Sequence, residues 1–272
     1  MVVTVFHGRH VHLARQREGL ARSSIPAVHV VVGMDDDHVP TPVDGLETWV
    51  VDVAPHPLGL PLAAARNRGV EEALRQDPDV VVLLDVDCIP GPTMLEAYAG
   101  AAARHGDALL CGPVTYLPPA GPGGPDLDHL DDQLDPHPAR PAPEPGRTVL
   151  DADGHRLFWS LSFAVTPSIW QRIGGFDEVY VGYGGEDTDL GQRARQQGVP
   201  IAWTGGAHAF HQHHPVSRPP VEHVEDILRN GALFHDRWGW WPMQGWLDAF
   251  EELDLVRRTP DGWVQRPACE AN

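Results

Sequence analysis

The stretch VVVLLDVDCIP, residues 80–90, holds a run of apolar residues followed by two carboxylates. Five consecutive apolar, mostly β-branched residues predict a strand that is buried on both faces, as in a parallel sheet. Asp85 and Asp87 follow where this strand ends, and Pro90 stops it. Acidic residues often end strands only because the chain returns to water. Two carboxylates at this spacing can also hold Mg²⁺ or Mn²⁺ against a diphosphate, because such cations prefer oxygen ligands.

The same pattern extends outward over the first third of the chain. Apolar runs at 2–6, 28–32 and 48–53 predict three more strands, and the segments 10–22 and 62–75 predict helices. Short strands that alternate with helices are typical of an α/β fold, here a mostly parallel, nucleotide-binding sheet with helices on both faces. Ligands of such sheets bind outside the carboxyl ends of the strands. The residues that follow the strands are therefore candidates for function, namely 7–9, 35–37 and 85–88.

The second half of the chain is less regular. Residues 116–147 are crowded with proline, glycine and aspartate and predict a long, mobile surface loop, either a solvated insertion or a lid over a substrate. Strands are expected at 157–165 and 201–205, and a helix at 221–238 leads into the tryptophan cluster WGWWPMQGW. We therefore expect one domain over residues 1–215, which contains the loop, and a helical, tryptophan-rich C-terminal extension over residues 216–272 packed on it.

Composition narrows the classes of function. All 20 basic residues among the 272 are arginine, and 38 acidic residues give a formal net charge of −18. The absence of lysine from the sequence excludes pyridoxal-phosphate enzymes, Schiff-base aldolases and Walker-A P-loop proteins, each of which needs a lysine amine. The negative charge argues against nucleic acid and anionic membranes as partners.

Cysteine usage and hydropathy bear on the compartment. Cys88, Cys111 and Cys269 have no CxxC spacing and are odd in number, which argues against a disulfide framework and against a cysteine zinc site. No run of about 18 apolar residues occurs, and residues 1–10 lead straight into a strand, so we expect neither a signal peptide nor a spanning helix. These features indicate a cytoplasmic protein.

A glycine-rich segment with clustered acids forms the second candidate site. GGFDE at residues 174–178 is followed by GYGGEDTDL at residues 182–190. Glycines allow the backbone to approach a ligand closely, and the acids open a helix that can end before Gly198. Glu186, Asp187 and Asp189 also suit a helix N-terminus electrostatically, which accounts for one or two of them. The run of small residues around an aromatic favours a functional role.

Histidines form the third candidate site. The segment AHAFHQHHP, residues 207–215, has four histidines within seven residues. Imidazole is the commonest metal ligand among side chains, so at least one of these residues is expected to ligate a metal ion. If the segment is a strand, His211 and His213 share one face, while His208 and His214 lie on the other.

Arginines supply a fourth candidate site. The segment AARNRG, residues 64–69, opens the helix that precedes the aspartate strand. Because the chain has no lysine, contacts to a phosphate or a base must come from arginine, histidine or a metal ion. Arg66 and Arg68 are candidates for such contacts, and two arginines on a solvated helix face are the alternative.

Taken together in chain order, these segments resemble the family 2 glycosyltransferases with the GT-A fold, in particular the branch with a galactosyltransferase-type carboxyl half. The matching segments lie within residues 1–215 and are AAARNRGVEEA, VVVLLDVDCIP, FWSLSFAVTPSIWQRIGGFDE, VGYGGEDTDLGQRARQQG and AFHQHH. GGFDE with GYGGEDTDLGQRAR is the most specific. The resemblance implies a metal-dependent, inverting transfer of a sugar from a nucleotide-sugar to a hydroxyl of a small molecule or glycan. The implied donor is a UDP-sugar, with galactose as one candidate sugar.

The resemblance also implies roles around the metal ion and the donor. Asp87 is expected to ligate Mn²⁺ or Mg²⁺ directly, and Asp85 is expected at the donor ribose or near the metal. His211 is the preferred histidine ligand, with His208 as the alternative. The other donor-binding residues expected are Asp35 at the base, Arg66 along the nucleotide, and His214.

The acidic helix carries the chemistry in this interpretation. Asp187 is expected to be the catalytic base, and Glu186 is expected beside it at the acceptor. Asp187 would deprotonate the acceptor hydroxyl, which attacks the anomeric carbon opposite the leaving diphosphate.

Two other classes stay open at this point. A metal-dependent nucleotidyltransferase shares a nucleotide-binding sheet and paired acids, but it does not need an acid-headed helix in the second half. A non-catalytic carbohydrate-binding protein would use the aromatic side chains of the tail, Trp238, Trp240, Trp241 and Trp246. These tryptophans also suit a core or a homo-oligomer surface.

Overall fold

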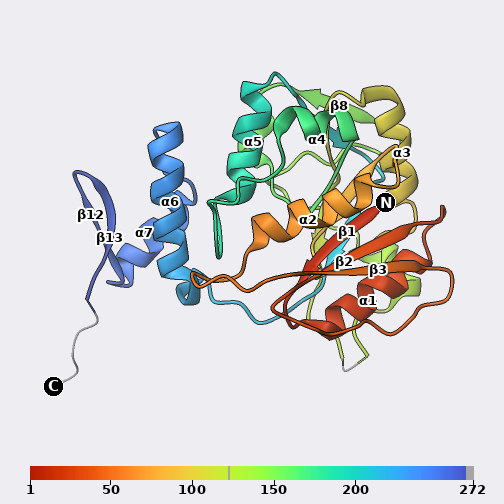
Figure 1. Ribbon diagram of the computed structural model, residues 1–272, viewed down its shortest axis with the longest axis horizontal. Coiled ribbons are helices and arrows are strands. Elements are labelled where there is room, and N and C mark those ends of the chain that lie inside the picture. Colours follow the sequence, from red (N-terminus) through yellow and green to blue (C-terminus); the bar gives the residue numbers. More distant parts are fainter. Residues whose placement is uncertain (122, 268–272) are drawn as a thin grey trace.

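The central sheet has eight strands in the order β3-β2-β1-β4-β9-β6-β10-β8 in the computed structural model, which describes residues 1–121 and 123–267 (Figure 1). β1 pairs in parallel with β2 and β4, and β2 with β3. β9 is antiparallel to β4 and β6, and β8 is antiparallel to β10. The strands are β1 (Val2–Phe6), β2 (Val28–Met34), β3 (Glu47–Val53), β4 (Val81–Leu84), β6 (Leu109–Cys111), β8 (Thr148–Asp151), β9 (Ser162–Val165) and β10 (Ile201–Thr204).

Helices cover both faces of this sheet. Val81 and Leu83 of β4 pack on the side of α2, α4 and α5, whereas Val82 and Leu84 pack on the side of α1 and α3. A strand buried on both faces needs apolar residues at every position, which the sequence provides. The predicted α/β fold is therefore confirmed. The helices are α1 (His10–Ala21), α2 (Leu62–Leu74), α3 (Met94–His105), α4 (Pro167–Ile173) and α5 (Glu186–Gln196).

A second, three-stranded sheet lies beyond the end of β4. It has the order β5-β11-β7, formed by β5 (Cys88–Pro90), β11 (Ala209–His211) and β7 (Val114–Tyr116). β11 is antiparallel to β5 and parallel to β7. This small sheet joins the segment after the aspartates to the histidine-rich segment.

The proline-rich segment is anchored to the body, in contrast to the mobile loop expected for residues 116–147. It contains two 3₁₀ turns, η1 (Leu127–His129) and η2 (Asp131–Gln133), and Leu127 and Leu130 are buried against Ile89 and Phe210. Arg140 is 6% exposed. Its guanidinium lies over two indole rings, 5.5 Å from that of Trp159 and 5.2 Å from that of Trp203.

The strand expected at 157–165 is shorter than predicted. A 3₁₀ turn, η3 (Gly154–Leu157), occupies the start of that stretch, and the strand begins at Ser162. Cys88 and Cys111 are buried free thiols, and Cys269 lies outside the described residues. None of the helices in the described part of the chain has the length and apolar character that a bilayer span requires.

The tail forms a lobe at one end of the long axis, next to α5 and the loop that precedes it (Figure 1). Its own small core contains Ile227, Leu247, Phe250 and Trp263, with Trp241 and Trp246 packed against it. A hairpin closes this core. The elements are η4 (Val221–His223), α6 (Val224–Trp238), α7 (Gln244–Glu252), β12 (Val256–Thr259) and β13 (Gly262–Gln265).

Candidate active site

The first part of the site forms where β4 ends. The strand leads into Asp85 and Asp87, and the following strand, β5, pairs with β11. The register aligns Cys88 with His211, so this histidine lies beside Asp87. The strand ends at His211, and the chain then brings His214 to the same carboxylate. The Nε2 atom of His211 lies 3.5 Å from Oδ1 of Asp87, and Nε2 of His214 lies 3.3 Å from Oδ2.

Asp87, His211 and His214 form a possible metal-binding cluster, because one ligand atom from each lies within 4.8 Å of the others. Each side chain is 13% exposed. Burial acts to raise the pKa of Asp87, but the hydrogen bond from His214 and the charges of His211 and Arg9 lower it overall. Burial lowers the pKa of His211. An ionised carboxylate and a neutral imidazole are the forms that bind a metal ion.

Two residues near the amino terminus support this cluster. Gln16 is fully buried on α1, and its amide donates to the carbonyl oxygens of Asp85 at 2.7 Å and Cys88 at 3.0 Å. These bonds fix the turn between β4 and β5. Arg9 Nη1 lies 3.3 Å from Asp87 Oδ2, and its side chain is 37% exposed. The arginine therefore partly neutralises Asp87 and still presents positive charge to solvent.

Arg66 joins the cluster to the acidic start of α5. Its Nη2 atom lies 3.1 Å from Asp85 Oδ1, and its Nη1 atom lies 3.0 Å from Glu186 Oε1. The side chain is 7% exposed, and the guanidinium lies over the Phe176 ring, 5.2 Å from its centroid. Two acidic segments that are far apart in the sequence therefore belong to one site.

Glu186 and Asp187 stand in the first turn of α5 and have raised pKa values. Burial first, and then the charge of Asp187, raises the pKa of Glu186 to about 7 against the opposing charge of Arg66. Burial also raises the pKa of Asp187. Its Oδ1 accepts hydrogen bonds from the Thr188 amide at 2.6 Å and from the Thr188 hydroxyl at 3.2 Å. Carboxylates in this environment take up a proton more readily than carboxylates in water.

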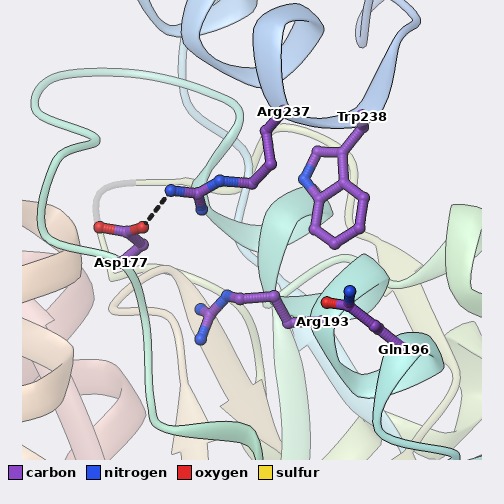
Figure 2. Close-up of a pocket in the computed structure, with 5 residues that line it drawn as sticks. All are labelled: Asp177, Arg193, Gln196, Arg237 and Trp238. Atoms are coloured by element: carbon purple, nitrogen blue, oxygen red, sulfur yellow. Dashed lines mark hydrogen bonds and ion pairs between the residues drawn. The ribbon is translucent and has the colours of Figure 1, made fainter.

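Asp189, the third acid of this turn, has a different environment. It is fully buried and accepts hydrogen bonds from Arg193 at 2.7 Å, Arg237 at 2.8 Å and Trp238 at 2.9 Å. Figure 2 shows Arg237 reaching from α6 to Asp177, 2.6 Å away. The charges around Asp189 are therefore paired and connect α5 to the tail. They surround a pocket of about 290 Å³ lined by Asp177, Arg193, Gln196, Arg237 and Trp238.

The described structure brings most, but not all, of the candidate residues together. His208 lies apart from the cluster, because its Nε2 is 2.7 Å from the Thr115 hydroxyl and burial lowers its pKa to about 4. His213 is exposed. The alternation expected for a strand does not extend to it, since β11 ends at His211. Asp35 is exposed and has a left-handed backbone with φ of 49°.

Asp36, next to Asp35, is held in place by hydrogen bonds to its side chain. Its Oδ2 accepts from the Gly8 amide at 2.6 Å and lies 2.8 Å from His10 Nε2. Burial acts to raise the pKa of Asp36, but hydrogen bonds from His10 and from the His38 and Gly8 amides lower it overall. Arg9 and Asp36 lie in the candidate segments 7–9 and 35–37, which follow the adjacent strands β1 and β2, but the sequence did not single out these two residues within their segments.

Solved structures with similar folds include glycosyltransferases. Residues 1–349 of Staphylococcus aureus TarS, in complex with UDP-GlcNAc, match with a TM-score of 0.60 and 13% identity over 86% of this chain and 65% of that chain. GalNAc-T7 with UDP, GalNAc and Mn²⁺ matches with a TM-score of 0.54 and 16% identity over 92% of this chain and 56% of that chain. At this identity the likeness concerns the fold alone. The protein has the GT-A fold.

Sequence comparisons find similarity to glycosyltransferases. A family model described as the N-terminal domain of galactosyltransferase matches residues 154–220. Validoxylamine A glucosyltransferase of Streptomyces hygroscopicus subsp. limoneus is 30% identical over 226 residues, 74% of this chain and 48% of the relative. Chondroitin synthase of Escherichia coli is 26% identical over 178 residues, 58% of this chain and 26% of the relative. The chain spans about half or less of these curated relatives. Together these likenesses support a family 2-type glycosyltransferase.

Proposed function

We propose that the protein is a metal-dependent, inverting glycosyltransferase that moves a hexose from a UDP-sugar to a hydroxyl group of a small molecule or glycan. The observation that carries this proposal is the bridge made by Arg66, which hydrogen-bonds to Asp85 and to Glu186. It places the aspartates after β4 next to the acidic turn of α5. The proposed donor site and the proposed proton acceptor would then lie at one edge of the sheet, where α/β sheets bind ligands.

The matched proteins support the choice of donor. TarS and GalNAc-T7 are described in complex with UDP-GlcNAc and with UDP, GalNAc and Mn²⁺, respectively. The matched family model is named for a galactosyltransferase, and the Streptomyces relative is named a glucosyltransferase. These names favour a UDP-hexose, with glucose and galactose as the first sugars to test.

Asp87, His211 and His214 would hold the divalent cation. One carboxylate and two imidazoles suit Mn²⁺ better than Mg²⁺, which prefers a shell of oxygen atoms. When bound, the cation supplies positive charge against the diphosphate of the donor and of the leaving group. Arg9 would add a second positive charge beside the metal site, because its guanidinium lies 3.3 Å from Asp87 and remains partly exposed. In a chain with a formal charge of −18, such local cations are needed to bind a diphosphate.

The residues after β1 and β2 would bind the nucleoside. Asp35 and Asp36 lie at the carboxyl ends of adjacent strands, and the hydrogen bonds of Asp36 to Gly8 and His10 keep this corner in place. Arg66 would lie along the nucleotide, and its buried guanidinium would hold the carboxylate of Asp85 in place.

Asp187 would act as the general base. Its carboxylate takes the proton of the acceptor hydroxyl while the hydroxyl oxygen forms a bond to the anomeric carbon. The bond from that carbon to the phosphate oxygen breaks, the diphosphate leaves with the electron pair, and the anomeric configuration is inverted. Glu186 would lie beside the acceptor. Arg66 joins the acidic turn of α5 to the proposed donor site. This arrangement favours sugar transfer over nucleotidyl transfer, because nucleotidyl transfer does not need a base at this position.

The test is an assay of product formation. The protein is incubated with UDP-glucose or UDP-galactose, Mn²⁺ and a panel of sugar and cyclitol acceptors, and both UDP release and glycoside formation are measured. NMR of the product determines the anomeric configuration. We expect acceptor-dependent UDP release that EDTA abolishes and a product of inverted configuration. Release of pyrophosphate, or a product of retained configuration, would refute the proposed mechanism.

A further inference from the structure

We propose that the C-terminal tail supplies part of the acceptor site, through an aromatic wall of Tyr183, His223 and Trp246 that takes a pyranose ring. This inference rests on the proposed function and names the class of acceptor. His223 and Trp246 belong to the tail, whereas Tyr183 belongs to the glycine-rich loop that leads into Glu186 and Asp187. The acceptor would therefore be bound between the GT-A body and the tail.

The three rings lie together beside the acidic turn. The rings of Tyr183 and His223 are stacked, with centroids 4.5 Å apart and planes 15° from parallel. The ring of Trp246 lies 5.8 Å from that of Tyr183 at a tilt of 30°. Tyr183 is 37% exposed, so part of its ring is open to solvent, and His223 and Trp246 are half-buried. Only Gly184 and Gly185 separate Tyr183 from Glu186 in the chain.

Helix α6 holds the loop that carries Tyr183. Asn230 is fully buried, and its amide nitrogen lies within hydrogen-bond distance of three carbonyl oxygens, those of Val181 at 3.0 Å, Tyr183 at 3.2 Å and Gly184 at 2.9 Å. Asp226 accepts a hydrogen bond from the Tyr183 amide at 3.0 Å. The tail thus positions the loop as well as contributing rings.

Two glycines allow this close approach. A Cβ atom at Gly182 would collide with the Asp226 carboxylate, and one at Gly184 would lie 2.7 Å from Met243 Sδ. Both glycines have positive φ, 76° and 89°. The glycines that the sequence places before the acids therefore have a structural purpose, which is to seat the loop against α6 and α7.

The chemistry of the wall suits a ring with one apolar face. A pyranose presents C–H groups on its face and hydroxyl groups at its rim. The C–H face can pack on an aromatic ring while rim hydroxyls reach polar groups. Burial first, and then the charges of Asp187 and Glu186, raise the pKa of Tyr183, which places its hydroxyl in the field of these carboxylates. Because only Gly184 and Gly185 separate Tyr183 from the acidic turn, a ring on the wall would lie beside Glu186 and Asp187.

The experiment compares ring binding in matched tryptophan variants. Methyl β-D-glucopyranoside is the probe, sorbitol is the open-chain comparison, and both are titrated by saturation-transfer NMR in the presence of UDP and Mn²⁺. Trp246→Leu removes a ring of the wall. Trp240→Leu is the control, because Trp240 is a tail residue that packs on Phe234 and Arg156 instead. His223→Ala is a second, smaller change in case Trp246→Leu fails to fold.

We expect the wild type to bind the glucoside more tightly than sorbitol. Trp246→Leu and His223→Ala should each weaken glucoside binding, by up to about tenfold for the tryptophan, and Trp240→Leu should leave it unchanged. A wild type that binds the glucoside no better than sorbitol, or equal binding in all variants, would overturn the proposal. UDP binding in the same samples separates this outcome from failure of the proposed function, which would appear as absence of UDP binding with Mn²⁺.

Discussion

The carboxyl groups of Asp87, Glu186 and Asp187 lie in one site, but their pKa values are shifted in opposite directions. The pKa of Asp87 is lowered, and those of Glu186 and Asp187 are raised. Asp87 has two imidazoles and a guanidinium around it, and its pKa is lowered overall although burial opposes the shift. Glu186 faces the negative charge of Asp187, and the pKa values of both carboxyl groups are raised, with burial as the main cause. Environment alone gives these carboxylates different chemistry.

This difference suggests a division of work. An acid that stays ionised is suited to hold a cation, whereas an acid that binds protons more readily is suited to accept one. Arg66 contacts the glutamate and Asp85 at once, so its charge offsets part of the repulsion between the two acidic segments. The predictions that follow separate the two parts of the site.

The largest expected effect is that of Asp187→Asn. Asparagine keeps the size of the side chain and loses the carboxylate that accepts the proton of the acceptor. Turnover should fall by about 10²–10⁴-fold, the usual contribution of a general base. UDP binding should change little, because Asp187 is absent from the Asp87 cluster. Parallel measurement of turnover and UDP binding checks this, and near-normal turnover would remove Asp187 from the mechanism.

The second prediction concerns the pH dependence of stability through Glu186. Its pKa is about 7 in the folded protein and the ordinary 4.5 in the unfolded chain. A raised carboxyl pKa stabilises the fold below about pH 4.5, and this stability is lost as the pH rises through about 7. Glu186→Gln removes this titration. The variant should therefore gain stability relative to wild type between pH 4.5 and 8, by up to about 3 kcal/mol.

Denaturant unfolding in EDTA at pH 4.5 and pH 8 measures this gain for Glu186→Gln. Glu71→Gln, at an exposed residue of α2, is the control and should show no such gain. Parallel pH dependence in wild type and Glu186→Gln would show that the glutamate is not destabilised by burial.

The third prediction distinguishes the histidines. His211→Ala and His214→Ala should each weaken Mn²⁺-dependent UDP binding by at least about tenfold, since each removes an atom of the cluster. His208→Ala should have a smaller effect on this binding, because His208 contacts Thr115 instead. His213→Ala, at an exposed histidine, is the control. If His208→Ala were the most damaging change, the cluster would be assigned to the wrong histidine.

The sequence was most informative where hydrophobic runs set the structure. The strand at Val2–Phe6 matches its predicted bounds, and α1 and α2 end one residue before theirs. These elements are specified locally, by periodicity and by residues that suit a buried parallel sheet. The order of the strands and the insertion of antiparallel β9 depend on long-range pairing, which such runs do not encode.

Single residues of the site also depend on long-range pairing that hydrophobic runs do not encode. The position of His211 beside Asp87 depends on the pairing of β11 with β5, and that of His214 on the path of the chain after the strand. The resemblance pointed to Asp35, and the sequence did not show that the neighbouring Asp36 contacts Gly8 and His10. The packing of Leu127 and Leu130 was hidden by the proline-rich composition around them.

The most direct test of the division of work is the metal dependence of nucleotide binding. Titration calorimetry with UDP compares wild type and Asp87→Asn, each in Mn²⁺ and in EDTA. We expect wild type to bind UDP at least about tenfold more tightly with Mn²⁺ than with EDTA, because the ionised Asp87 and its two imidazoles hold the cation that meets the diphosphate. Asp87→Asn should lose this difference. Equal affinity of the wild type in Mn²⁺ and in EDTA would contradict the assignment of Asp87 to a metal site.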